Sequence, residues 1–275
     1  MTTRPAIPRL HYLARPGTFD SIEQPYVDVR RSEGRLFDDS LVRQLPKLPR
    51  ALPLAAEWTI RDASSKRLIA ALAAFARNLP GTVTTGVSIL DLGCGNGWLS
   101  ARLARLPGSR VLGLDINSVE LEQANRVFGH VPNLRFAYGD IFSLSGPLNN
   151  TDDHRADIDT SFDIIVCASA LQYFDNLSEL VIKLRSSLNP SGQIHFLDSP
   201  VYNSDAEVAA AQARTKAYFE HLKVDPHPAY HSHRLSTLLA LGAVIHYNPH
   251  GLFVRALRIA GLHNPNPFYW LMLHA

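Results

Sequence analysis

Three glycines at alternate positions follow a short apolar run, with a carboxylate just ahead of them. The stretch ILDLGCGNGWLS places Gly93, Gly95 and Gly97 shortly after Asp91. The dinucleotide fingerprint needs a third glycine where Trp98 stands, and a P-loop needs a Lys followed by Ser or Thr after its last glycine. Asp91 would repel a pyrophosphate. It suits a ligand that brings a positive charge or hydrogen-bond donors, such as an α-amino group.

Two further carboxylates complete a pattern that suits a nucleoside. Asp115 ends the next apolar run, about 20 residues beyond the loop, where an acid is expected to bind ribose hydroxyls. Asp140, in YGDIF, follows the third run and can accept a hydrogen bond from an exocyclic amine. The sequence thus offers acids for an amino group, a ribose and an adenine amine, and no basic residue for a phosphate. S-adenosylmethionine has that layout.

Alternating strands and helices must position these residues. Short apolar runs alternate with helical patterns, which predicts a parallel sheet covered on both faces, with the ligand at the carboxyl ends of its strands. Ser118 is the expected N-cap of the helix after Asp115. The expected strands are 87–92, 111–114, 134–138, 162–167, 193–198, 243–247 and 269–273. The expected helices are 57–79, 98–106, 119–128, 177–188, 205–224 and 234–241.

Residues from about 57 to 275 resemble a class I S-adenosylmethionine-dependent methyltransferase of the small-molecule type. LDLGCGNGWLS resembles the first motif of that family, VLGLDINSVELEQA its acidic-loop motif and FAYGDIF its adenine motif. FDIIVCASALQYF and LNPSGQIHFLDS resemble the fourth and fifth strands with their flanks. The resemblance implies a Rossmann-like α/β fold with helices on both faces of a seven-stranded sheet. The last strand of that sheet would run antiparallel between the fifth and the sixth.

The resemblance also implies a set of residues that bind the cofactor S-adenosylmethionine. The glycine loop would approach the methionine part, Asp115 the ribose, and Asp140 the adenine. Trp58 and Arg61 precede the first strand, where Arg61 could clamp the cofactor carboxylate; the alternative is a core tryptophan with a solvated arginine. The whole expected set is Trp58, Arg61, Asp91, Gly93, Cys94, Gly95, Gly97, Asp115, Ile116, Gly139, Asp140, Ile141, Ala168 and Ser169.

The sequence indicates the catalytic residue less clearly than the cofactor-binding residues. The candidates are His231 and His233, whose imidazoles could take a proton from an acceptor, and Tyr173, whose ring could shape the acceptor pocket. Asp198 with Tyr202 is a second candidate pair for a base. Surface or capping histidines and plain helix packing are the alternatives. No spacing of Cys and His indicates a metal site.

The chain divides into an N-terminal arm, residues 1–56, and a methyltransferase domain, residues 57–275. The arm holds seven of the 18 prolines and shows no sustained apolar period, so we expect an irregular segment and a candidate lid. Residues 199–234 are expected to form a lid segment on the acceptor side. The acidic stretch NNTDDHRADID, residues 149–159, is expected to be a solvated insertion.

The composition limits the partners. The chain has 275 residues, a net charge of +2 and only two cysteines, Cys94 and Cys167. A charge of +2 gives no strong attraction to polyanions, so we expect no nucleic-acid partner and no membrane association. With no signal-peptide pattern and no disulfide framework, we expect a cytoplasmic protein, as a monomer or homodimer. The expected partner is a small-molecule acceptor, a secondary or specialised metabolite.

Two other functions compete with methyl transfer to an O, N or C atom. The same fold could transfer or cyclise the aminocarboxypropyl part of S-adenosylmethionine. The chain could also be a cofactor-binding subunit without catalysis. Methylthioadenosine as a product would indicate the first alternative, and binding without turnover would indicate the second.

Overall fold

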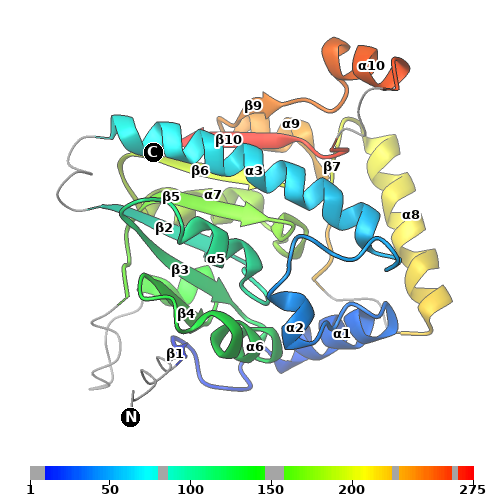
Figure 1. Cartoon of the computed structure of the whole chain (residues 1–275). Coiled ribbons are helices and arrows are strands. Elements are labelled where there is room, and N and C mark those ends of the chain that lie inside the picture. The colour runs from blue at the N-terminus through cyan, green and yellow to red at the C-terminus, as the bar shows by residue number, and fades with distance from the viewer. Residues whose placement is uncertain (1–9, 80–85, 146–157, 225–228, 262–265) are drawn as a thin grey trace.

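The computed structural model describes residues 10–79, 86–145, 158–224, 229–261 and 266–275, and its centre is a twisted sheet (Figure 1). The strand order in this eight-stranded sheet is β1-β4-β3-β2-β5-β6-β10-β9. Its strands are β1 (His11–Tyr12), β2 (Val87–Leu92), β3 (Ser109–Asp115), β4 (Leu134–Tyr138), β5 (Phe162–Ala168), β6 (Leu188–Leu197), β9 (Val244–Tyr247) and β10 (Trp270–His274). A separate parallel pair joins β7 (Val201–Tyr202) to β8 (His233–Arg234).

The sheet confirms the expected topology and adds a strand to it. Strand β10 runs antiparallel to both β6 and β9, while the other pairs in this sheet are parallel. The last strand therefore lies between the fifth and sixth strands of the seven-stranded core. The added strand is β1, which pairs with β4 at the far edge.

Helices cover both faces of the sheet. The described helices are α1 (Asp20–Ser32), α2 (Asp39–Val42), α3 (Ala55–Asn78), α5 (Trp98–Leu103), α6 (Ser118–Phe128), α7 (Leu177–Ser186), α8 (Asp205–Leu222), α9 (Leu235–Ala240) and α10 (Leu252–Ile259), with 3-10 turns η1 (Ile141–Ser145) and η3 (Leu171–Tyr173). Side chains from α3, α5 and α6 form one apolar cluster with the sheet, and side chains from α7 and α9 form a second. The sheet therefore separates two cores. Figure 1 shows the helices on the two faces of the sheet.

Strand β2 shows why the glycine loop starts where it does. Val87 and Ile89 belong to one core and Leu90 and Leu92 to the other, because successive side chains of a strand point to opposite faces. All six residues of β2 are buried. A strand buried on both faces sits at the centre of the sheet, so its carboxyl end lies in the middle of the edge where ligands bind such folds.

Several local expectations need correction. The N-cap of α6 is Asn117, whose side chain accepts from the N–H of Glu120, and Ser118 is the first helical residue. The NPSG stretch that was expected to follow the helix over 177–188 instead lies inside β6. The N-terminal arm contains helical structure, which the sequence left open, since α1 is a 13-residue helix that contains Pro25. Of the acidic insertion, 149–159, all but the last two residues lie outside the described part.

No helix within the described ranges combines the length and the apolar character that crossing a membrane requires.

Candidate functional site

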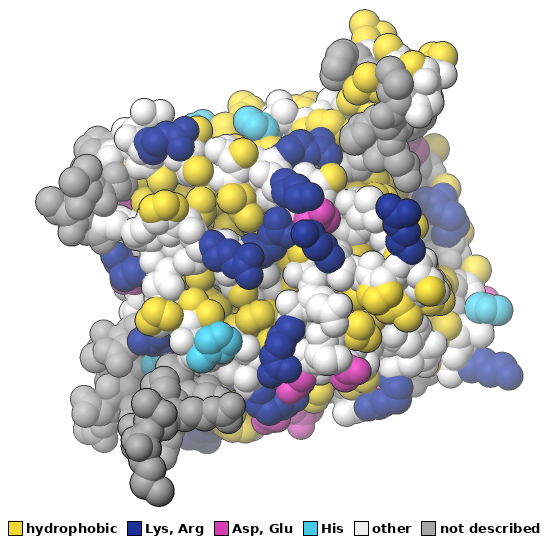
Figure 2. Space-filling view, in the orientation of Figure 1, with side chains coloured by type: hydrophobic (Ala, Val, Ile, Leu, Met, Phe, Trp, Pro, Cys, Tyr) yellow, Lys and Arg dark blue, Asp and Glu magenta, His cyan; other side chains and the backbone are white. Residues whose placement is uncertain are grey.

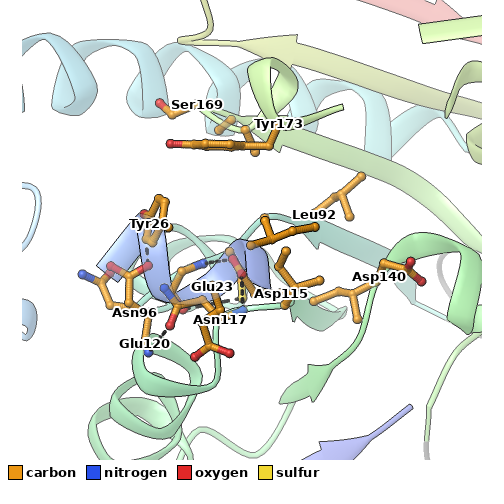
Figure 3. A pocket seen from close by; sticks show the side chains of 18 of the residues that line it. Glu23, Tyr26, Leu92, Asn96, Asp115, Asn117, Glu120, Asp140, Ser169 and Tyr173 are labelled. Carbon is orange, nitrogen blue, oxygen red and sulfur yellow. Dashed lines mark hydrogen bonds between the residues drawn. The ribbon is translucent and has the colours of Figure 1, made fainter. Parts of the chain in front are cut away.

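A cavity of about 390 Å³ opens at the carboxyl ends of the central strands (Figure 3). Its walls come from the glycine loop, from the ends of β3, β4 and β5, and from α1 and α3. Among its lining residues are Phe19, Ile22, Glu23, Tyr26, Arg30, Arg35, Trp58, Arg61, Gly93, Cys94, Gly95, Asn96, Asp115, Ile116, Asn117, Glu120, Gly139, Asp140, Ile141, Ala168, Ser169, Tyr173 and Phe174. Most of the expected cofactor-binding residues thus line one space.

The loop needs glycine at its three positions partly because the surrounding protein leaves no room there for a Cβ atom. Gly93 has a φ of 72°, and a Cβ there would come within 2.4 Å of the Cβ of Ala170. Gly95 has a φ of 51°, and its Cβ would lie 2.9 Å from a carboxylate oxygen of Glu120. Positive φ values and these close approaches both favour glycine. Gly97 does not line the cavity, and a Cβ there would overlap the ring of Phe136.

The carboxylate of Asp115 holds the glycine loop in position through hydrogen bonds to backbone N–H groups. One carboxylate oxygen accepts from the N–H of Gly95 at 2.7 Å, and the other accepts from the N–H of Asn117 at 2.8 Å. Burial and the nearby Glu120 raise the pKa of Asp115 to about 6. The carboxylate lines the cavity, in the middle of the view in Figure 3. It therefore joins the loop to the start of α6 and presents an acid to the cavity.

Helix α1 closes one side of the cavity through polar contacts with α6. A carboxylate oxygen of Glu23 accepts from the N–H and hydroxyl of Ser118, at 2.8 and 2.6 Å. The hydroxyl of Tyr26 donates to Glu120 at 3.3 Å and accepts from Nε of Arg30 at 2.9 Å. Burial raises the pKa of Glu120. These four cavity residues were not expected from the sequence, because the contacts of Glu23 with Ser118 and of Tyr26 with Glu120 join positions 95 and 94 residues apart in the chain.

The residues expected on the adenine side gather at the ends of β3 and β4. Gly139, Asp140 and Ile141 line the cavity together with Ile116. Asp140 accepts from the N–H and hydroxyl of Ser143, at 2.7 and 2.6 Å, which anchors the turn η1. Asp140 is therefore both a turn residue and a wall of the cavity.

Trp58 and Arg61 lie on α3 and reach the cavity from the opposite wall. Arg61 donates to the hydroxyl of Ser169 at 3.0 Å and to Glu57 at 2.8 Å, and its guanidinium lies 5.2 Å from the ring centroid of Trp58. Its side chain is only 20% exposed, so the alternative of a solvated arginine is excluded. The indole N–H of Trp58 is buried and has no hydrogen-bond partner among the described residues.

Backbone strain marks the ends of β5 and β6. Ser169 and Asp198 have φ values of 58° and 54°, which are unusual for residues other than glycine. The hydroxyl of Ser169 donates to the carbonyl of Asp198, whose carboxylate accepts from Ser64 and Asn266 at 2.6 Å each. Ala168 and Ser169 line the cavity, whereas Asp198 does not. This corrects the expectation that Asp198 with Tyr202 provides a base.

Asp91 is placed differently from the expectation. It is 1% exposed, it does not line the cavity, and its carboxylate accepts from the hydroxyl of Ser100 at 2.6 Å. Side-chain alternation along β2 turns it toward α5, beneath the loop, so it supports the loop and does not face the cavity. Burial raises its pKa to about 7. Burial also raises the pKa of Cys94, a cavity residue whose thiol therefore stays protonated.

The candidate bases His231 and His233 also lie outside the lining of the cavity. The N–H of His231 donates to the carbonyl of Gln172 at 2.7 Å, and its ring stacks on that of His233 with centroids 6.2 Å apart. His233 is 8% exposed and belongs to β8, which pairs with β7; burial lowers its pKa. The two histidines thus hold the 171–173 turn and β8 in place. This corrects the expectation that either imidazole faces an acceptor.

Tyr173 does line the cavity, as expected. Its ring packs edge-to-face on Tyr26, with centroids 5.7 Å apart, and on Tyr230, with centroids 5.9 Å apart. Burial raises the pKa of Tyr173, so its phenol stays protonated near neutral pH. Figure 3 shows it facing Tyr26 across the cavity. No group of three or more His, Cys, Asp or Glu side chains in the described residues could hold a metal ion.

Comparison with known proteins identifies the class. Residues 90–194 match the profile of a family described as a methyltransferase domain. Over 105 residues the chain is 38% identical to a trans-aconitate 2-methyltransferase of Deinococcus radiodurans, a match that covers 38% of this chain and 34% of that protein. Over 110 residues it is 32% identical to a malonyl-[acyl-carrier protein] O-methyltransferase of Halalkalibacterium halodurans, covering 40% and 38%. The chain thus spans little more than a third of the length of these relatives.

Solved structures extend the likeness over most of the chain. A cyclopropane synthase from Mycobacterium tuberculosis superimposes with a TM-score of 0.54 at 15% identity, over 84% of this chain and 76% of that one. A putative sarcosine dimethylglycine methyltransferase from Galdieria sulphuraria gives 0.52 at 16% identity, over 91% and 97%. These likenesses show a shared fold. The chain therefore has the fold of these methyltransferase-like structures, and residues 90–194 match the methyltransferase domain family.

Proposed function

We propose that this chain is an S-adenosylmethionine-dependent methyltransferase that acts on a small-molecule acceptor. The observation that carries the proposal is the convergence of the glycine loop, Asp115 and Asp140 from three strand ends onto one cavity. The methyltransferase names of its relatives support the same reaction class.

Unpartnered polar atoms in the cavity wall fit a polar ligand. The indole N–H of Trp58, the amide oxygen of Asn96 and the amide nitrogen of Asn117 are buried there without a hydrogen-bond partner in the described structure. Each unsatisfied buried group costs about 1–3 kcal/mol. A ligand with donors and acceptors at matching positions would recover part of that cost, so the cavity favours a ligand such as a nucleoside joined to an amino acid.

The residues present fit S-adenosylmethionine. The glycine loop with Arg61 and Ser169 would hold its methionine part, Asp115 its ribose, and Ile116, Asp140 and Ile141 its adenine. When bound, this cofactor supplies a methyl group already activated by a positive sulfur. The buried carboxylates of Asp115 and Glu120 give this side of the cavity an acidic character, which suits a cation.

The remaining wall would position the acceptor and exclude water. Tyr26 and Tyr173 face one another over the glycine loop, and α1 closes the cavity beside them. Positioning and desolvation can supply a large share of the barrier reduction in a transfer between two bound reactants. Because Tyr173 stays protonated, it would orient an acceptor by donating a hydrogen bond and would not remove its proton. We assign no general base.

The two cysteines support a proposal about the compartment. Cys94 and Cys167 are both buried and unpaired. Unpaired cysteines are typical of a reducing compartment, and we place the enzyme in the cytoplasm.

Binding of S-adenosylhomocysteine, measured by calorimetry, tests the cofactor assignment, with NAD as the comparison ligand. We expect S-adenosylhomocysteine to bind and NAD not to bind; the reverse would refute the proposal. Turnover is then measured with methyl-labelled S-adenosylmethionine and a panel of small carboxylic acids, phenols and amines. Label in the acceptor supports methyl transfer. Methylthioadenosine as the product, or tight binding without transfer to any acceptor, would point to the two competing functions.

A further inference from the structure

The net charge of +2 conceals a segregation of charge along the chain. Residues 226–275 contain three arginines, seven histidines and no Asp or Glu. The preceding 225 residues carry the other 24 basic and all 25 acidic residues. The last 50 residues are therefore positive, while the rest of the chain is close to neutral.

Within this basic segment, α10 turns apolar side chains to solvent. Leu252 and Ile259 are 83% and 88% exposed, and Arg255 and Ala256 between them are exposed as well. These four residues follow the spacing i, i+3, i+4, i+7, so they form one face of the helix. Val254, on the other side, is 8% exposed and anchors the helix to the protein. A stripe with this spacing normally faces a core.

The position of α10 leaves this face exposed relative to the other described residues. The helix stands off the body at one corner of the molecule in Figure 1, and its apolar atoms project there in Figure 2. It follows β9, an edge strand whose Val244 and Ile245 are 49% and 40% exposed. In Figure 2, Lys and Arg side chains predominate over Asp and Glu on the same face of the molecule.

We propose that α10 is an interfacial anchor that docks this chain on an anionic lipid surface. Leu252 and Ile259 would enter the boundary between headgroups and acyl chains, while Arg255 stays at the level of the negative headgroups. A second copy of the chain is a poorer occupant, because a symmetric contact would bring this acid-free segment against itself. A nucleic acid would leave the two apolar side chains without a partner. The proposal revises the expectation from net charge and goes beyond the methyl-transfer reaction.

Co-sedimentation of the full chain with lipid vesicles tests the anchor. The vesicles are phosphatidylcholine alone, or phosphatidylcholine with a minority of phosphatidylglycerol, at low and at physiological salt. We expect binding to the anionic vesicles that weakens with salt. The double variant Leu252→Ser/Ile259→Ser should lower the partition coefficient by about tenfold or more, since two apolar side chains no longer insert. Arg255→Gln should weaken binding and reduce its salt dependence.

Ile182→Ser is the matched control, because Ile182 is 70% exposed on α7, in the other helical layer. It should bind vesicles as the parent does, and circular dichroism should show all variants folded. Failure of the parent to bind anionic vesicles would overturn the proposal. An equal loss of binding in Ile182→Ser would also overturn it. So would light scattering that shows a dimer which the double variant converts to a monomer, with vesicle binding unchanged.

Discussion

Replacement of Asp115 should affect both the stability of the glycine loop and the affinity for the ligand, and the two effects can be measured separately. In the free protein its carboxylate accepts from the backbone N–H groups of Gly95 and Asn117. Asp115→Ala leaves both donors without that acceptor, and each such loss costs about 1–3 kcal/mol. Relief of the repulsion from Glu120 offsets part of the cost. We expect the free energy of unfolding to fall by about 2–4 kcal/mol.

The effect on the ligand is worked out separately. Hydrogen bonds from ribose hydroxyls to a charged carboxylate are worth about 1.5–3 kcal/mol, so the dissociation constant for S-adenosylhomocysteine should rise about 10- to 150-fold. Calorimetry measures this constant, and urea unfolding measures stability. Asp115→Asn keeps one acceptor oxygen and should be more stable than Asp115→Ala, while its affinity should still fall.

Asp163 provides a matched control at the amino end of β5, on the side of the sheet away from the cavity. Its carboxylate accepts from the N–H of Ser88 at 2.8 Å and from the side chain of Asn189 at 2.9 Å. Asp163→Ala should therefore destabilise the fold by about 1–3 kcal/mol and leave the dissociation constant unchanged. If Asp115→Asn binds S-adenosylhomocysteine as tightly as the parent does, the assignment of Asp115 to the ribose is refuted.

Three more predictions concern acids. Because the pKa of Asp115 is raised to about 6, affinity for S-adenosylhomocysteine should weaken as the pH falls below about 6, and the Asp115→Asn variant should lose this dependence; an identical pH profile in both would contradict the reasoning. Burial raises the pKa of Asp91 to about 7, so the folded state binds the proton of this carboxyl more tightly than the unfolded chain does. The contribution of Asp91 to stability therefore falls as the pH rises from about 4 to about 7. Asp91→Asn can still accept a hydrogen bond from Ser100, so this variant should be more stable than the parent above pH about 7. Thermal unfolding should show that the difference in stability between the two proteins disappears in acid. Glu23→Ala removes the acceptor for the first N–H groups of α6 and should cost about 1–2 kcal/mol in urea unfolding; no change would mean that α1 does not cap α6.

The central sheet could be predicted because its strands are buried on both faces. The bounds of β2 and β4 agree with the expected 87–92 and 134–138. Both runs are short and apolar, and Gly or Pro residues lie near their ends, so local pattern and final environment coincide. The acids at the strand ends could be predicted for the same reason, since their position depends only on where a strand stops.

Helix α1 could not be predicted from its pattern. Only Glu23 and Val27 are buried in it, and Pro25 interrupts it, so it lacks the apolar stripe that identifies a helix. Its buried carboxylate is satisfied by α6, 95 residues away. Contacts of that separation leave no local signal in the sequence. The only local sign of this helix was the charged residue Glu23, which lies at a helical position close to Pro25.

Three polar residues, Asp91, His231 and His233, do not line the cavity, because spacing along the chain does not reveal the direction of a side chain. Asp91 stands next to the glycines, yet strand alternation turns it beneath them. His231 and His233 stand in a segment that often covers an acceptor, yet the backbone of His231 is bonded to Gln172 and His233 is paired within β8. The sequence placed the acids at the strand ends beside the cavity, and the roles assigned to them stay predictions.

The contacts of α1 also set the order in which the cavity can be completed during synthesis. Glu23 on α1 accepts from Ser118, 95 residues later, and Glu33, just after α1, accepts from Tyr218 on α8, 185 residues later. Non-local contacts form late, because the intervening chain must first be ordered. Helix α1 therefore completes its contacts only after α8 has been translated, and the cavity wall that it supplies forms late.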